Sequence, residues 1–315
     1  MIITLHRICN KLPLTLDANL GLYTSTETLI NFILYAKKLD KKFISLNQYI
    51  KKINKKDYIT ITFDDGYLDN YELAYPILKD FNIPFTIFIT TDFILNKNLP
   101  WWFLLEDFLV KKTLNNKKIS EKYLELFTII SKNNRVNREF LNIRKKILDN
   151  KFDIKILDTY KKFTNKRLGK RMFMNWEELE YINNDYLFTL GCHTVSHKRL
   201  SNCSFEESNY QINRSKYILE KKLKIKIKHF AYPYGGFWDF GRKEIKILRL
   251  NNFESGLTTI SYNFINKIDN KFMISRIPLS EEFQNPLINK NNFKKLEIIN
   301  ILKYLIIKIY MRIFS

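Results

Sequence analysis

The most restrictive feature of this sequence is the alternation of short apolar runs with segments of helical periodicity. Residues 58–63, YITITF, are β-branched and aromatic without a breaker, and residues 84–89, PFTIFI, form a second such run. Runs of this kind are typical of buried strands. A helix is predicted between them over 70–81, and a first strand at 1–6 precedes an amphipathic helix over 26–39. Further strands are predicted at 186–191, 227–232, 253–258 and 272–277, and a further helix at about 204–222. This alternation of strands and helices along the chain predicts a parallel α/β sheet or barrel.

The alternation stops between about 97 and 175, where helical periodicity is punctuated by Lys, Asn and Glu. We interpret this segment as a helical insertion. Near its start lie Trp101 and Trp102, which either line a cleft or anchor the insertion by packing. The 315 residues suffice for one barrel-sized domain, and no linker rich in proline or glycine divides them. The sequence therefore predicts one domain over 1–285 that carries the insertion.

Residues 286–315 form a basic amphipathic tail. Within it, 294–315 is apolar except for a narrow polar row that includes Lys303, Lys308 and Arg312. Charges at these places argue against a membrane-spanning helix, whereas a helix lying in the membrane interface with snorkelling lysines fits the pattern. A terminal helix that docks on the protein's own core or on a second copy fits equally well, so the oligomeric state stays open.

The chain is strongly basic. Its 53 Lys and Arg against 32 acidic residues give a formal charge of +21, which favours an anionic partner such as a lipid surface, a nucleic acid or a phosphorylated intermediate. Compositional bias towards Lys, Asn and Ile explains the excess equally well. No helix-turn-helix, zinc-finger or RNP-like segment is present, so specific nucleic-acid binding is not expected.

The N-terminal run and the cysteines bear on the cellular compartment. The run is broken by His6 and Arg7 and lacks the long apolar core of a secretory signal. The three cysteines, Cys9, Cys192 and Cys203, are odd in number and show no CxxC spacing, which argues against a disulfide framework and a thiolate zinc site. These features predict a cytoplasmic protein, peripheral at the inner face of the membrane if the tail is interfacial.

Two adjacent carboxylates, Asp64 and Asp65, end the apolar run 58–63. An acid pair there is a poor candidate for core packing. Neighbouring side chains on extended backbone point in different directions, so one carboxylate can bind a cation while the other faces substrate or water.

Two of the four histidines, His193 and His197, lie in the segment HTVSH. Spaced four apart, they are expected on one face of a helical turn just beyond a strand. With one carboxylate they would form a facial set of two His and one Asp that leaves positions open for water and substrate. The sequence therefore predicts a hydrolytic site with a divalent metal.

Taken in order, the segments TFDDGY, HTVSH and FAYPYG resemble the signature segments of the polysaccharide deacetylase (NodB-homology) family. The resemblance covers most of residues 1–280 and leaves the insertion and the tail unexplained. It implies a distorted (β/α) barrel that removes acyl groups, usually acetyl, from amino-sugar nitrogen with a bound divalent metal.

The resemblance also implies roles. Asp64 would be the general base, and Asp65, His193 and His197 would hold the metal, with Zn²⁺ favoured over Co²⁺, Ni²⁺ or Mn²⁺. The backbone N–H of Tyr234 would stabilise the tetrahedral oxyanion.

The chain departs from the family pattern in two places. Ala231 stands where many members have an arginine that pairs with the base, and no histidine follows His229 to act as general acid. Arg276, in ISRIPL, either takes over the pairing or is a simple surface arginine. His6, in TLHRI, resembles the early histidine of circularly permuted poly-N-acetylglucosamine deacetylases and would protonate the leaving amine; the alternative is a structural histidine that caps the strand.

The expected function is metal-dependent removal of an N-acyl group, acetyl or formyl, from an amino sugar of a cell-envelope polysaccharide or of its lipid- or nucleotide-linked precursor. The alternative is an inactive barrel that binds a glycan or an assembly partner. The two departures favour that alternative, whereas the complete set of acids and histidines argues against it.

Overall fold

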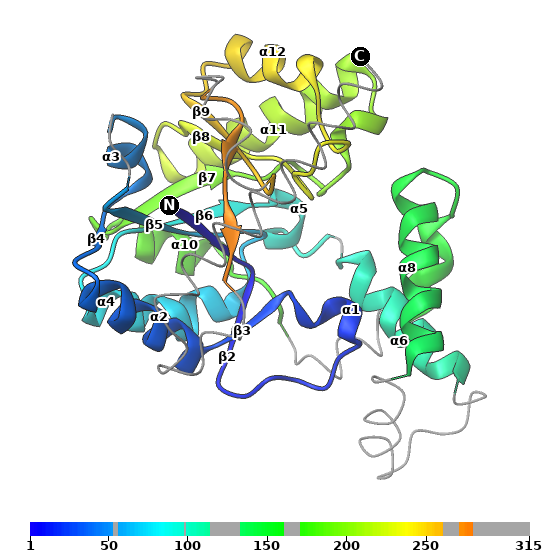
Figure 1. The fold of residues 1–315 in the computed structure, drawn as a ribbon. Helices are drawn as coiled ribbons and strands as arrows, with labels where there is room; N and C mark the ends of the chain where they lie inside the picture. Colours follow the sequence, from blue (N-terminus) through cyan, green and yellow to red (C-terminus); the bar gives the residue numbers. More distant parts are fainter. Residues whose placement is uncertain (53–55, 98, 114–132, 161–170, 261–270, 280–315) are drawn as a thin grey trace, which may run out of the picture.

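The computed structural model describes residues 1–52, 56–97, 99–113, 133–160, 171–260 and 271–279 (Figure 1). Its centre is a parallel sheet in the order β10-β9-β8-β7-β6-β5-β1-β11, with β4 added beside β5. The strands are β1 (Ile2–Leu5), β4 (Lys42–Phe43), β5 (Tyr58–Phe63), β6 (Phe85–Ile89), β7 (Phe188–Cys192), β8 (His229–Ala231), β9 (Ser255–Thr258), β10 (Ile274–Ser275) and β11 (Ile277–Pro278). The fold is a distorted (β/α) barrel, as predicted.

One short segment closes the barrel. The sequence predicts a single strand at 272–277, but the structure divides this region into β10, which pairs with β9, and β11, which pairs with β1. Arg276 lies at the junction, and its N–H donates to the carbonyl of Thr258 at 3.1 Å. The division has a physical cause: the segment passes from one edge of the sheet to the other and exchanges hydrogen bonds with each in turn.

Helices cover the outside of the barrel. In Figure 1, α2 (Thr26–Lys38) and α4 (Tyr75–Asp80) lie on one flank, and α11 (Phe205–Leu223) and α12 (Arg242–Leu250) on the other. The remaining outer helices are α3 (Leu46–Ile50), α10 (Trp176–Asn183) and the turn η3 (Leu200–Asn202). The predicted helix at 70–81 begins as a π-helix, η1 (Asn70–Ala74), before it continues as α4. The described helices include none that is both long and apolar enough to cross a membrane.

The segment predicted as an insertion contributes α6 (Trp101–Thr113), α8 (Asn134–Leu148) and the 3-10 turn η2 (Ile154–Tyr160), and the short helix α5 (Thr91–Ile94) precedes it. In Figure 1, α6 and α8 pack together at one side of the barrel, beside α1 (Asp17–Leu20). A small parallel pair, β2 (Arg7–Cys9) and β3 (Tyr23–Ser25), follows β1. The tail predicted over 286–315 lies outside the described residues, and the proposed domain boundary near 285 stays a prediction.

Candidate active site

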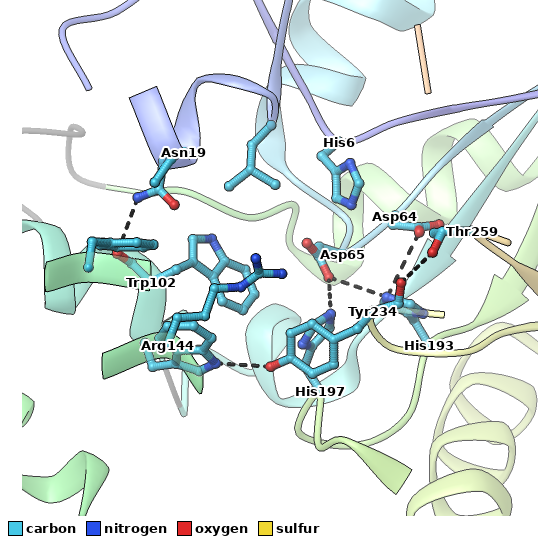
Figure 2. Close-up of a pocket in the computed structure, with 14 residues that line it drawn as sticks. His6, Asn19, Asp64, Asp65, Trp102, Arg144, His193, His197, Tyr234 and Thr259 are labelled. Atoms are coloured by element: carbon cyan, nitrogen blue, oxygen red, sulfur yellow. Dashed lines mark hydrogen bonds and ion pairs between the residues drawn. The ribbon is translucent and has the colours of Figure 1, made fainter. Parts of the chain in front are cut away.

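The carboxyl ends of the strands surround a cavity of about 220 Å³ (Figure 2). Six of the predicted site residues line it, namely His6, Asp64, Asp65, His193, His197 and Tyr234. The seventh, Arg276, lies directly behind Asp64. The strand ends of a parallel barrel converge on one face, which explains why residues so far apart in the sequence meet here.

Asp64 and Arg276 form a buried, bidentate ion pair. Nη1 of Arg276 donates to Oδ1 of Asp64 at 2.6 Å, and Nη2 donates to Oδ2 at 2.7 Å. Arg276 is fully buried, so the interpretation as a surface arginine is wrong. Burial alone would raise the pKa of Asp64, but the guanidinium charge and the nearby His193 hold that pKa well below its usual range. Asp64 is therefore ionised and fixed in orientation.

Asp65, His193 and His197 form a compact cluster whose candidate ligand atoms all lie within 4.8 Å of one another. Oδ1 of Asp65 lies 3.6 Å from Nε2 of His193 and 3.4 Å from Nε2 of His197. Both Asp65 oxygens are buried and have no hydrogen-bond partner within the described part of the chain. Buried carboxylate oxygens left in this way are costly unless a cation satisfies them, and one carboxylate with two imidazoles is a donor set that divalent zinc accepts. The residues fit a divalent metal.

The tautomer of His193 suits this role. Its Nδ1 lies 2.8 Å from the carbonyl oxygen of Ala231, which can only accept, so Nδ1 carries the proton. The lone pair of Nε2 then faces Asp65. A backbone carbonyl that orients the ring through its other nitrogen is a common support for a metal-binding histidine. Position 231, without the family's arginine side chain, thus still serves the site through its backbone.

Burial shifts the pKa values of all three groups towards their neutral forms. It raises the pKa of Asp65, with the charge of Asp64 adding to the effect. Burial also lowers the pKa of His193 to about 4 and the pKa of His197 well below 6.5. Neutral imidazoles are the form that binds metals. A deprotonated Asp65 in this position requires a nearby positive charge.

The HTVSH segment is not a helical turn, and that prediction is wrong. Thr194 (φ 71°) and His197 (φ 57°) are left-handed in an irregular loop. Oε1 of Gln211, on α11, accepts hydrogen bonds from the N–H groups of Val195 and Ser196 at 3.1 and 3.0 Å. Side chains from elsewhere in the fold therefore replace the hydrogen bonds of a helix, and the two imidazoles converge by loop geometry.

Left-handed backbone recurs in each signature segment. Besides the HTVSH loop, it occurs at Asp65 (φ 73°) with Gly66 (φ 83°), and at Tyr234 (φ 62°) with Gly235 (φ 67°). Each such non-glycine residue costs roughly 1–3 kcal/mol, and such outliers cluster at functional sites. A Cβ at position 235 would lie 2.8 Å from the backbone nitrogen of Thr259, so the turn requires glycine there.

Tyr234 presents a free backbone donor. Its N–H donates to no acceptor in the described chain, whereas its carbonyl accepts from Oγ1 of Thr259 at 2.6 Å. Its hydroxyl accepts a hydrogen bond from Nε1 of Trp101 at 2.9 Å, which joins the turn to the insertion. The N–H is thus held in a fixed turn at the edge of the cavity.

His6 lies beyond the end of β1 and lines the cavity (Figure 2). Its ring makes no hydrogen bond to another described residue, which argues against a strand-capping role. Its backbone is held instead: Nδ2 of Asn70 donates to the carbonyl of His6 at 2.7 Å, and Asp69 accepts from the N–H of Ile8 and from Arg7. Burial lowers the pKa of His6, although the charge of Asp64 opposes this.

Asp69 and Asn70 were not predicted as site residues. They follow the acid pair in DDGYLDN and lie where η1 begins. Their closeness in sequence to Asp64 and Asp65 is the feature from which they could have been predicted as site residues. His229, in contrast, lies outside the cavity. It is buried in β8 between Oγ of Ser255 and Oδ1 of Asn47, each 2.9 Å from a ring nitrogen.

The two tryptophans have both of the roles considered for them. Each is more than nine-tenths buried, and each lines the cavity. The ring of Trp102 meets His197 edge-on at a centroid distance of 5.1 Å. The insertion therefore supplies one wall of the site.

Fold and site together define a (β/α) barrel with an Asp–His–His candidate metal centre beside a buried Asp–Arg pair. The model of the family described as Polysaccharide deacetylase matches residues 51–123 and 130–253, more than half of the chain. The chain belongs to the polysaccharide deacetylase family.

Solved structures share the fold at low sequence identity. The Streptococcus pyogenes deacetylase PplD, in complex with acetate, has a TM-score of 0.59 at 16% identity, with 94% of this chain and 96% of that chain covered. A de-N-acetylase from Aggregatibacter actinomycetemcomitans has a TM-score of 0.56 at 14% identity (94% and 98% covered). IcaB from Ammonifex degensii has a TM-score of 0.55 at 15% identity (90% and 93% covered).

A curated relative matches only locally. The Bacillus subtilis protein YxkH is 58% identical over 31 residues, which are 10% of this chain and 11% of that protein. The match thus spans about a tenth of that relative's length.

Proposed function

We propose that the protein is a metal-dependent hydrolase that removes an N-acyl group from an amino sugar of a cell-envelope polysaccharide or of its lipid- or nucleotide-linked precursor. The observation that carries the proposal is the Asp65–His193–His197 cluster, with unsatisfied carboxylate oxygens, beside the ionised Asp64. Membership of the polysaccharide deacetylase family supports the substrate class.

Asp65, His193 and His197 would hold the metal, for which Zn²⁺ is the first candidate. A divalent ion bound there polarises an amide carbonyl and makes a bound water more acidic. Asp64 accepts the proton of the attacking water, and Arg276 keeps its carboxylate ionised and aimed at the cavity. Proton transfer by a positioned group of this kind contributes roughly 10²–10⁴ in rate.

The remaining groups act on the oxygen and nitrogen of the amide. The free N–H of Tyr234 donates to the oxygen that becomes negative in the tetrahedral state. His6 delivers a proton to the leaving nitrogen. Because burial lowers the pKa of His6, the ring is neutral in the free protein at pH 7. The proton that Asp64 accepts from the attacking water passes to His6, on whose ring the charge of Asp64 acts, and from His6 to the leaving nitrogen.

Arg276 weakens the case for an inactive barrel. That alternative depended on the missing arginine at position 231 and on the missing late histidine. In the bidentate pair Asp64 receives a guanidinium from Arg276, at the junction of β10 and β11, and His6 supplies an imidazole at the cavity.

Localisation is part of the proposal. The charge of +21 and the amphipathic pattern of 294–315 support a cytoplasmic protein that is peripheral at the inner face of the membrane and acts on a linked precursor.

The test is hydrolysis of a defined panel. Purified protein loaded with Zn²⁺ is offered N-acetylated and N-formylated amino-sugar oligosaccharides, sugar nucleotides and lipid-linked sugars, and released acetate or formate is measured by mass spectrometry. Asp64→Asn should retain the metal and lose turnover. Asp57→Asn, which changes an exposed carboxylate paired with Lys41, is the matched control and should hydrolyse like the wild type. No acid released from any member of the panel would contradict the proposed activity.

A further inference from the structure

One wall of the cavity comes entirely from outside the barrel strands. Trp101 and Trp102 lie on α6, and Phe140 and Arg144 lie on α8. The ring planes of Trp101 and Phe140 are inclined by only 27° at a centroid distance of 6.5 Å. This wall offers flat apolar faces to whatever occupies the cavity.

Arg144 brings a charge to this wall that the proposed chemistry does not use. Figure 2 shows its side chain extending from α8 into the cavity, towards the acids and histidines. No ion pair or hydrogen bond joins its guanidinium to another residue in the described ranges. Arg144 is exposed to solvent as well as lining the cavity, so its guanidinium lies where an anionic group of a bound ligand can replace water as its partner.

A second donor beside Arg144 also lacks an acceptor. Nε1 of Trp102 is buried and has no hydrogen-bond partner in the part of the chain that the structure describes. Trp102 itself is more than nine-tenths buried and lines the same cavity. A buried N–H without an acceptor costs about 1–3 kcal/mol, which a ligand oxygen would recover.

The wall is fixed in place by a buried glutamate. Glu106, on α6, accepts hydrogen bonds from Oγ1 of Thr15, from the N–H of Leu16 and from Nδ2 of Asn19 at 3.0, 2.9 and 2.7 Å. Nδ2 of Asn19 also donates to the carbonyl of Trp102 at 3.3 Å. With its amide nitrogen held on that side, Asn19 turns its carbonyl oxygen towards the cavity as an acceptor (Figure 2).

We propose that this wall is a subsite for an anionic group, a phosphate or a carboxylate, carried by the substrate next to the N-acylated sugar. The proposal rests on the proposed deacylase function and names the substrate class for it. Arg144 pairs with the anion, since a guanidinium presents two parallel donors to phosphate or carboxylate oxygens. Trp102 donates to an oxygen of the same ligand, and Trp101 and Phe140 pack against the apolar face of a sugar ring.

The experiment compares three substrates of equal length: a neutral N-acetylated amino-sugar oligosaccharide, its phosphorylated form, and a form with one uronate. We expect at least one anionic form to have a kcat/KM about tenfold higher than the neutral form, the effect of one charge-assisted contact. Arg144→Gln should remove this preference, so that the anionic forms are hydrolysed no faster than the neutral form. Arg138→Gln is the matched control, because Arg138 is exposed on the same helix, as Arg144 is, but does not line the cavity.

Binding provides a second measurement that does not depend on turnover. Quenching of tryptophan fluorescence by the deacylated products should show about tenfold tighter binding of the anionic product, lost in Arg144→Gln and weakened by salt. A preference for the phosphorylated form would identify phosphate as the anion, and a preference for the uronate form would identify a carboxylate. Each of these results supports the subsite. Equal rates on all three forms would overturn the subsite while the deacylase function stands. Failure of the deacylase function looks different, since no form would then be hydrolysed.

Discussion

Replacing Arg276 with methionine tests the electrostatic arrangement at the centre of the site. Methionine keeps much of the buried volume but removes both hydrogen bonds to Asp64, at 2.6 and 2.7 Å, and leaves a fully enclosed carboxylate without its counter-ion. Breaking a buried ion pair in this way costs about 3–5 kcal/mol. The enclosed acid can escape part of that cost only by taking up a proton.

Protonation of Asp64 in Arg276→Met makes the loss of stability depend on pH. A carboxylic acid with the reference pKa of 3.8 is ionised at pH 7, and keeping it protonated at that pH costs about 4 kcal/mol. At pH 5 the cost falls to about 2 kcal/mol. In the wild type a lower pH has the opposite effect on this site. The pKa of Asp64 is lowered in the folded protein, so the ionised carboxylate stabilises the fold above pH 4 and this contribution is lost as the pH falls below about 4. We therefore expect Arg276→Met to be destabilised by about 4 kcal/mol at pH 7 and by about half as much at pH 5.

The assay is denaturant unfolding of metal-free protein at both pH values, for wild type, Arg276→Met, Asp64→Asn and the double variant. The double variant should recover at least about 2 kcal/mol at pH 7, since neither charge remains. Two results together would refute the argument that the guanidinium acts by compensating the buried carboxylate. Arg276→Met would be destabilised equally at pH 7 and pH 5, and the free-energy changes of the two single variants would add up to that of the double variant.

Three further predictions concern other groups. Asp65→Asn should weaken Zn²⁺ binding at least about 100-fold in equilibrium dialysis while Asp57→Asn binds normally; unchanged affinity would remove Asp65 from the ligand set. His6→Gln should lower kcat by about 10²–10⁴ at unchanged metal content, and wild-type rates would assign the proton donor elsewhere. The pKa of buried His229 is lowered to about 4 by desolvation, so its contribution to stability is present above 6.5 and is lost as the pH falls towards 4. Between pH 7 and 5 the wild type should lose about 2 kcal/mol more than His229→Gln in denaturant unfolding, and equal losses would show that this ring is not held neutral.

The strands and the convergence of their ends could be predicted because their causes are local. Buried parallel strands need continuous β-branched and aromatic runs, and 58–63 and 84–89 have them. Polar residues that directly follow such runs, as Asp64 and Asp65 do, then meet at one face of the barrel.

The parts that could not be predicted depend on contacts between distant residues. Nothing in HTVSH indicates that Gln211 will accept its backbone N–H groups and so prevent a helical turn. The run 272–277 has the composition of one strand, and only its two partners, β9 and β1, divide it. Arg144 belongs to a run of basic residues that has the pattern of an ordinary solvated helix face, so the sequence carries no sign of its place in the cavity.

The closing segment between β10 and β11 also governs the order in which the chain can fold during synthesis. β1 is made first but gains its second neighbour only when β11 appears, more than 270 residues later. Pairings between such distant segments form slowly, because the entropy cost of closing a long loop comes before the stabilising contacts form. Until then Asp64 has no counter-ion and one edge of β1 is open to other chains. Ribosomal products that stop short of residue 276 should therefore be substrates for chaperones and proteases rather than partly active enzymes.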